Sequence, residues 1–156
     1  MLRRLGFVAC TATLVALSSA TPASAQDARS SALGGLERAV ITKVNQVRGQ
    51  NGLGPLRASR RLSTAAEGHS GAMARGNFLG HGAWESRVRR YVDANRVGEV
   101  VAALSGRRRG LASRVVGMWL RSPPHRAVLL DGAMHRIGVG MRTSGGMAFF
   151  TADLAS

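Results

Sequence analysis

The sequence has 156 residues, of which 45% are hydrophobic and 19% charged, a composition typical of one folded domain and unlike that of a disordered chain. Its single cysteine excludes a disulfide framework and a thiolate zinc site. The 22 Lys and Arg residues against 8 Asp and Glu give a formal charge of +14. Lys43 is the only lysine, so we do not interpret the arginine enrichment by itself as ligand recognition.

The first 25 residues have the three parts of a secretory signal peptide: a positive start (Arg3, Arg4), a mostly apolar run over residues 5–17 and a small-residue cleavage site at Ala23-Ser24-Ala25. The apolar run is too short for a membrane span, which takes about 20 residues, and no later run is long enough. We therefore expect export to the periplasm or the cell exterior. Cleavage would remove the cysteine and leave 20 basic residues against 8 acidic ones.

The periodicity of apolar residues then predicts two long helices. A short flexible lead over residues 26–32 precedes the first helix, which begins at residue 33 and is stopped by Asn51-Gly52. The next four residues must be extended, because the residue before a proline avoids the helical region. Ser59 is the expected N-cap of the second helix, which ends at Asn77 or Gly80.

The second half of the chain predicts shorter elements. In order, they are a short helix over residues 84–92, an apolar run over 100–104, a charged loop over 106–110, a helix over 111–120 stopped by Ser122-Pro123-Pro124, and strands over 137–141 and 147–154. Gly145-Gly146 is a hairpin signal between the two strands. Helices first and an antiparallel sheet last predict an α+β fold with helices packed on a sheet, and residues 33–156 as one domain.

Four histidines are the residues most able to carry chemistry. His69 is in phase with the apolar stripe of its helix and is interpreted as a packed histidine, and His135 as a strand-end histidine bonded to backbone. His81 lies in a glycine-flanked loop beyond a helix end, where functional residues concentrate. His125 follows two prolines, which give it a stiff backbone.

Glu99 is a lone carboxylate at the start of an apolar run, where burial is costly unless the group is paired. Together, His81, Glu99 and His125 would suit a divalent, zinc-like ion with an open position. They would equally suit a general acid–base pair. Their spacing alone does not show that the three side chains meet.

Several short motifs follow one another in a recognisable order. The first half contains Val44-Asn45-Gln46-Val47-Arg48, His69-Ser70 and Asn77-Phe78-Leu79-Gly80-His81; the second half contains Gly98-Glu99, Trp119-Leu120-Arg121-Ser122-Pro123-Pro124-His125-Arg126 and Ile137-Gly138-Val139-Gly140. Together they resemble the CAP superfamily (SCP-like extracellular domain), which includes the cysteine-rich secretory proteins, antigen 5 and the plant pathogenesis-related proteins. The resemblance covers about residues 36–154, and the last two motifs are typical of bacterial members.

The resemblance implies a three-layer α-β-α sandwich with a cleft that holds two histidines and two acidic residues in many members, and a divalent metal in some. His81 matches the first histidine, Glu99 the first acid and His125 the second histidine. The second acid would fall near Ser122, and bacterial members with this motif commonly lack it.

Three departures from the family pattern weaken the expectation of full metal coordination. Val100 stands where an asparagine usually follows the cleft glutamate, Ala152 stands where a glutamine is expected, and the loop between His81 and Arg87 is short. The remaining three ligands would still be enough in principle for a water-bearing ion.

Three functions remain open on the sequence. The first is a secreted CAP-domain binding module with a divalent-metal cleft, and the second a metal-dependent, protease-like hydrolase that uses His81, Glu99 and His125. The third is a basic protein that binds anionic envelope polymers or lipids, although the two arginine clusters, at 87–90 and 107–109, are interpreted as solvated surface. Nucleic acid is not expected, because no aromatic residues are interleaved with the arginines.

Overall fold

The computed structural model describes residues 25–105 and 109–156, with side chains from Gly34 onward. Its elements in chain order are α1 (Ala25–Gln50), β1 (Arg57–Ala58), α2 (Arg60–Gly76), α3 (Trp84–Arg89), β2 (Val97–Ser105), α4 (Leu111–Arg121), α5 (Pro123–Leu129), β3 (Arg136–Ser144) and β4 (Met147–Ala155). The predicted signal peptide lies outside the described residues except for Ala25, so the division into signal, lead and domain stays a prediction.

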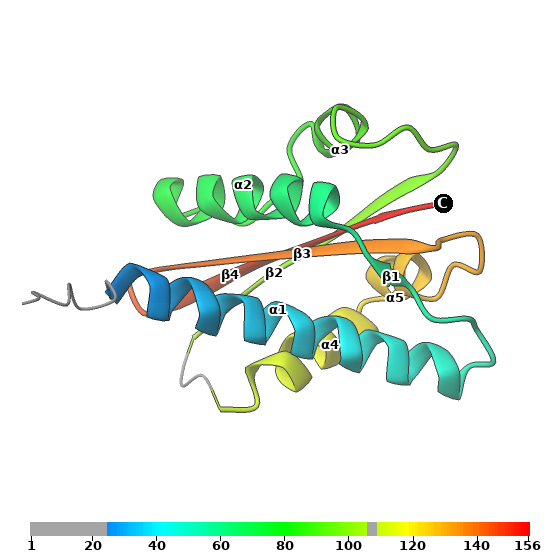
Figure 1. Ribbon diagram of the computed structural model, residues 1–156, viewed down its shortest axis with the longest axis horizontal. Helices are drawn as coiled ribbons and strands as arrows, with labels where there is room; N and C mark the ends of the chain where they lie inside the picture. The colour runs from blue at the N-terminus through cyan, green and yellow to red at the C-terminus, as the bar shows by residue number, and fades with distance from the viewer. Residues whose placement is uncertain (1–24, 106–108) are drawn as a thin grey trace, which may run out of the picture.

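The elements form three layers around one sheet, with α2 and α3 on one face and α1, α4 and α5 on the other (Figure 1). The strand order is β1-β3-β4-β2, which places β2 at an edge. This arrangement confirms the predicted α+β class and the three-layer sandwich. The two predicted strands, β3 and β4, are antiparallel as expected. The apolar run at 100–104 lies in a third long strand, β2, which is antiparallel to β4, and β1 joins β3 in parallel, so the sheet is mixed.

The main core lies between the sheet and the layer of α1 and α4. It is built from fully buried apolar side chains, including Val40, Val44, Val115, Trp119 and Phe150. A smaller cluster on the opposite face joins Leu62 of α2 and Val88 of α3 to Val97 and Ala155 of the sheet. Both faces of the sheet are therefore buried, which is why its strands are apolar almost throughout.

The Ile137-Gly138-Val139-Gly140 motif brings α2 onto β3. A Cβ atom on Gly138 would overlap the main chain of Leu62 and Ser63, and one on Gly140 would overlap that of Ala66 and Glu67. Because glycine has no Cβ, the helix backbone can lie directly on the strand at these two points.

The Val44–Arg48 motif ties α1 to the loops around it. The side chain of Asn45 exchanges two hydrogen bonds with the main chain of Leu56, which holds the extended segment before β1. Arg48 is 2% exposed and donates to the carbonyl groups of Gly54, Leu129, Asp131 and Met134. These bonds let a charged side chain lie inside the fold while joining the end of α1 to the end of α5.

The ends of α2 confirm the sequence analysis. Ser59 adopts an extended backbone and its hydroxyl accepts from the Leu62 N–H, as expected of an N-cap. Asn77 takes a left-handed conformation with φ 47° and its N–H donates to Met73, so the helix ends there and not at Gly80. The hairpin at Gly145-Gly146 is also confirmed, because both glycines have positive φ between β3 and β4.

Three element predictions were incomplete. The helix expected over residues 84–92 ends at Arg89. The two prolines after α4 do stop that helix, but they also begin α5, because proline fits the first turn of a helix. The helix expected from residue 33 begins earlier, because α1 starts at Ala25 and residues 26–32 contain no proline or glycine that would interrupt it. Across residues 25–105 and 109–156, none of the helices has both the length and the apolar character that crossing a bilayer requires.

Candidate functional site

Glu99 is the centre of the candidate site. It lies on the edge strand β2, and its side chain points to the α2 and α3 face, since Val97 two residues earlier packs there. The carboxylate is completely buried, with 0% side-chain exposure. We call Glu99 and the five side chains described below (His81, His125, Arg87, His69 and Asp153) the Glu99 cluster.

The structure brings the three predicted site residues together. The Nδ1 atom of His81 lies 2.9 Å from Oε1 of Glu99. The ring of His125, which lies near the start of α5, has its centroid 5.7 Å from that of His81. The loop after α2 therefore places the His81 imidazole against Glu99, and the turn into α5 places the His125 imidazole beside that of His81.

Arg87 of α3 is the cation of the cluster. Its Nη2 atom forms an ion pair with Oε2 of Glu99, and its Nη1 atom donates to the main-chain oxygen of His81. With a side chain only 15% exposed, Arg87 is not part of a solvated face, which corrects our interpretation of the arginine cluster at 87–90. Arg89, two residues later, does lie at the surface in an i,i+4 pair with Glu85.

His69 positions the loop that carries His81. Its Nε2 atom lies 2.8 Å from the carbonyl oxygen of Gly80, to which it donates, and 4.0 Å from Oε2 of Glu99. The ring is 6% exposed, so the packed-histidine interpretation agrees with its burial. Its bond to Gly80 adds a role that the sequence did not indicate, because it holds the residue next to His81.

Asp153 is a second buried carboxyl group. It pairs with Glu99 across β2 and β4 and is 0% exposed. As a carboxylate it would have no donor for either oxygen among the described residues. A protonated Asp153 instead has an O–H group that can donate to the neighbouring Glu99 carboxylate.

The surroundings set the charges of the cluster. Burial raises the pKa of both Glu99 and Asp153, but the Arg87 guanidinium lowers that of Glu99, whereas the neighbouring Glu99 raises that of Asp153 further. We therefore place the proton on Asp153 and the negative charge on Glu99. Burial lowers the pKa of His69, His81 and His125, so these imidazoles are neutral near pH 7.

These protonation states give His81 a defined tautomer. A neutral imidazole beside a carboxylate donates its Nδ1–H to that carboxylate, here Oε1 of Glu99. Its Nε2 atom is then a hydrogen-bond acceptor, and the His81 side chain is 41% exposed. The arrangement can bind a donor group of a ligand or take up a proton from one.

The Glu99 cluster does not fit a divalent metal ion. The Arg87 cation and the His81 ring already bond the two oxygens of Glu99, which leaves only the two imidazoles as free ligands. Among the described side chains, no group of three or more His, Cys, Asp or Glu residues is arranged to hold a metal. A protein zinc site normally needs at least three such ligands.

Beside the cluster, a groove of about 220 Å³ lies against the edge strand. It is lined by Leu79, Val101, Ala102, Met118, Trp119, Ser122 and His125. We call it the β2 groove. Ser122, the position near which the family's second acid would fall, caps the end of α4 and lies on this groove with His125.

The two departures from the family pattern at Val100 and Ala152 are neighbours. They are paired across β2 and β4 and both are 0% exposed within the main core, on the face opposite Glu99. Two apolar side chains thus stand opposite each other where the resemblance leads us to expect two amides. They fill the core and do not remove a group from the Glu99 cluster.

Residues 41–154 match the sequence profile of the CAP family, described as the cysteine-rich secretory protein family. This match covers most of the chain. The chain belongs to the CAP family. Members of this family are typically extracellular or secreted proteins. No match was found among the curated proteins.

Solved structures of other CAP domains share the fold. The chain resembles an extracellular protein with an SCP domain from Bacillus anthracis (TM-score 0.70, 24% identity, covering 86% of this chain and 45% of that one). It also resembles an outer surface protein of Borrelia burgdorferi (TM-score 0.68, 19% identity, 78% and 92%) and venom allergen-like protein 4 of Schistosoma mansoni (TM-score 0.63, 12% identity, 77% and 87%). At these identities the likeness shows the fold, and the bacterial neighbours agree with the bacterial motifs.

Sequence reasoning missed Arg87 and Asp153 in this CAP domain. Asp153 carried a signal, because an acidic residue in the apolar run 147–154 has to be buried with a partner. Arg87 carried none, since it stands in a cluster with Arg89 and Arg90 whose charges favour a solvated surface.

Proposed function

We propose that this CAP domain is an exported binding module, periplasmic or extracellular, that takes its ligand where His81 and His125 meet. The observation that carries the proposal is the placement of two neutral imidazoles with ring centroids 5.7 Å apart, one of which, His125, lines the β2 groove. In the buried part of the cluster, the charges of Arg87 and Glu99 balance each other. Glu99 orients the His81 ring, whose Nε2 atom remains available to a ligand. Export is supported by the signal pattern in the first 25 residues and by the family.

This proposal is tested by binding to bacterial envelope fractions. We compare the exported chain with the His81→Ala/His125→Ala variant at low and at high salt. A ligand held by the imidazoles is retained at high salt and lost in the variant. Binding that is unchanged in the variant and disappears with salt contradicts the proposal and indicates a general attraction to polyanions.

The second candidate is acid–base catalysis of a hydrolysis without a metal. The observation that favours it is the 2.9 Å contact of His81 Nδ1 with Glu99, because a carboxylate that orients an imidazole also makes its Nε2 atom a better base. Turnover of a peptide or ester reporter that persists in EDTA and is lost in His81→Ala would support this role. Turnover restored only by added zinc would support the metal-dependent enzyme instead.

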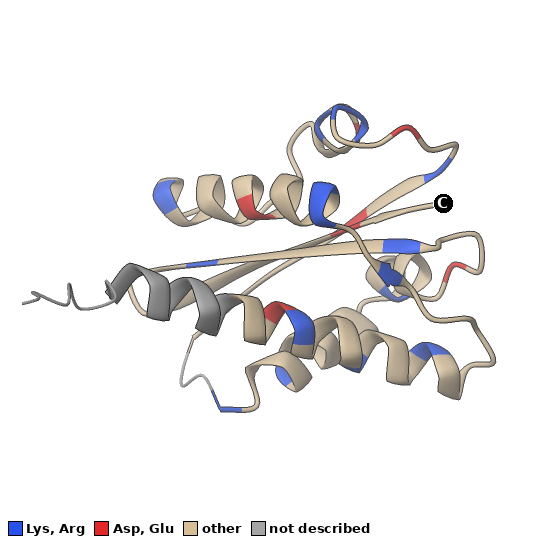
Figure 2. Cartoon of the chain, in the orientation of Figure 1, with Lys and Arg blue, Asp and Glu red and all other residues tan. Residues whose placement is uncertain are grey.

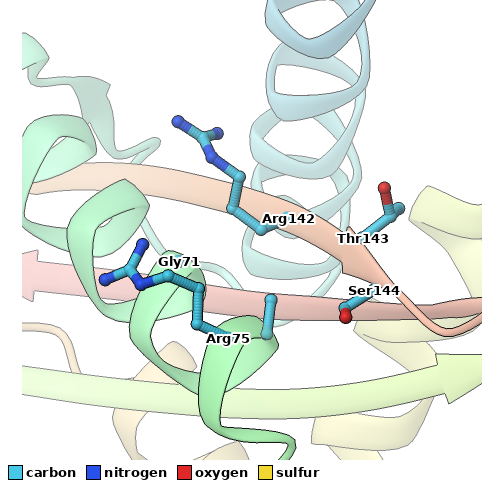
Figure 3. Close-up of a pocket in the computed structure, with 6 residues that line it drawn as sticks. Gly71, Arg75, Arg142, Thr143 and Ser144 are labelled. Carbon is cyan, nitrogen blue, oxygen red and sulfur yellow. The ribbon is translucent and has the colours of Figure 1, made fainter.

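The third candidate is binding of anionic envelope polymers or lipids, and a second hollow lined by arginines supports it. A separate hollow of about 150 Å³ lies on the β3 side of α2, with Arg75 from the helix and Arg142 from the strand among its lining residues (Figure 3). Arg142 also forms an ion pair with Glu67. If envelope binding is electrostatic, Arg75→Gln/Arg142→Gln weakens it more than His81→Ala/His125→Ala does.

A further inference from the structure

The outer edge of β2 has main-chain groups that no other strand uses. Among the described strands, β2 pairs with β4 alone. The Ser156 N–H donates to the Arg96 carbonyl, just before β2 begins. This bond fixes which residues of β2 direct their main-chain groups toward β4. Even-numbered residues of β2 therefore direct their N–H and C=O groups to β4, and odd-numbered ones direct them outward.

Val101 and Ala103 are the central outward-facing residues. Within the part of the chain that the structure describes, no side chain or main-chain group outside the sheet bonds their N–H or C=O groups. The next outward carbonyl, that of Ser105, already accepts from Arg114 of α4 at 2.8 Å. The free stretch of the edge thus runs from the Glu99 cluster to Arg114.

The β2 groove lies along this free stretch. Val101 and Ala102 belong to its lining, with Leu79 from the loop after α2 and Met118 from α4. Leu79 is 54% exposed and Met118 37% exposed, and Phe78, beside Leu79, is 44% exposed. These three are the exposed large apolar side chains of the described residues, and two of them, Leu79 and Met118, line the groove at the unpaired sheet edge.

The charge of the domain favours a negative partner. The chain carries 22 basic residues against 8 acidic ones, and Lys and Arg lie on both helical layers (Figure 2). At the free edge itself, Arg114 stands at one end. An acidic segment would therefore be attracted, whereas a second copy of this basic chain would be repelled.

We propose that the free edge of β2 binds an extended, acidic segment of a partner protein, which adds to the sheet as a fifth strand. Its main chain bonds Val101 and Ala103, and one apolar side chain enters the β2 groove between Leu79 and Met118. A fatty acyl chain could fill the groove but would leave those main-chain groups unbonded. The inference rests on the proposed binding role and names the class of partner.

The test selects peptides from a phage-displayed library of short random sequences on the exported chain. The selected peptides are expected to be acidic, free of proline at the centre and apolar at one central position. A synthetic copy with N-methyl groups on its central amides keeps the side chains but cannot pair as a strand, so it is expected to bind about tenfold more weakly or worse.

Two kinds of variant locate the binding site. Ala103→Pro blocks the edge without removing a bond to β4, since the N–H of Ala103 points outward. Leu79→Ser/Met118→Ser changes two exposed side chains and leaves the strand intact, so it serves if the proline variant does not fold. Both are expected to weaken peptide binding by about tenfold. Leu53→Ser, in the turn after α1, is the matched control and is expected to bind normally.

Amide exchange gives a direct readout of the pairing. Bound peptide is expected to slow exchange at Val101 and Ala103 and to leave the even-numbered residues of β2 unchanged. The proposal is overturned if no peptide is enriched, if the N-methylated copy binds equally, or if the edge variants only abolish self-association or fatty-acid uptake. If no peptide binds while envelope binding still depends on His81 and His125, the inference fails and the proposed function stands.

Discussion

Glu99 shares its two carboxylate oxygens between an imidazole and a guanidinium. Such an arrangement explains how a charge can be completely buried in a chain that also has to keep two histidines accessible. Breaking a buried ion pair from one side leaves the other charge without compensation, which costs much more than losing an exposed pair. The cluster is therefore as much a part of the stability of the domain as of its function.

Replacing the cation tests this view of Glu99. We expect Arg87→Met to lower the free energy of unfolding by about 3 kcal/mol, because Glu99 loses its buried partner. The matched control is Arg89→Met, which breaks an exposed i,i+4 pair and should cost about 0.5 kcal/mol or less. Urea unfolding at pH 7 measures both. Equal losses in the two variants would show that Arg87 does not neutralise a buried charge.

Asp153 gives the domain a pH dependence of known sign. Burial and Glu99 raise the pKa of Asp153 to about 8, above its value of about 4 in an unfolded chain. The folded state then binds more protons than the unfolded state, so this group favours folding below pH 4 and its contribution is lost as the pH rises toward 8.

Removal of the Asp153 carboxyl group should make the free energy of unfolding less dependent on pH. We expect Asp153→Asn, which keeps the shape and can still donate to Glu99, to be more stable than the parent by about 5 kcal/mol at pH 8 and similar to it at pH 4, because a shift of one pKa unit corresponds to about 1.4 kcal/mol. Glu37, whose pKa is raised to about 7 by burial, is present in both proteins and cancels in the difference. A difference that is constant with pH would mean that Asp153 is ionised throughout.

At the scale of elements, the backbone of α2 lies directly on β3 at two glycines. The sequence motif with Gly138 and Gly140 indicated the family, but its physical reason appears only in the packing, where a Cβ atom at either glycine would meet helix backbone. Such an overlap cannot be relieved by a side-chain rotation.

We expect Gly138→Ala to lower the free energy of unfolding by about 3 kcal/mol, because α2 has to move away from the sheet. Gly132→Ala is the control, since its Cβ would lie 3.7 Å from Leu53 in ordinary contact, and it should change stability by about 0.5 kcal/mol or less. Thermal unfolding followed by circular dichroism compares the two. A tolerated Gly138→Ala would contradict the close contact between α2 and β3.

The same elements show what could be predicted from the sequence. The caps at Ser59 and Asn77 depend on local backbone chemistry, so they could be predicted. The start of α5 was missed because the two prolines after Ser122 both end one helix and begin the next. The pairing of Val100 with Ala152 depends on strand register, which joins residues far apart in the chain and has no local signal.

For the whole molecule, the family motifs were enough to predict the fold and to predict that His81, Glu99 and His125 belong to one site. The motifs did not predict the charges around Glu99, because Arg87 and Asp153 reach Glu99 from α3 and β4 and are not part of the motifs that suggested the site. The three residues that the sequence suggested as metal ligands thus belong to a larger cluster, in which the positive charge of Arg87 balances the negative charge of Glu99. The site is consequently accessible through its histidines and not through its carboxylate.

Calorimetry with zinc chloride on the purified protein tests this conclusion most directly, with His81→Ala/His125→Ala as the control for adventitious binding. Because Arg87 already neutralises Glu99, we expect the two proteins to give the same small heats, with no stoichiometric zinc site. Binding of one zinc ion per chain that disappears in the double variant would contradict the account.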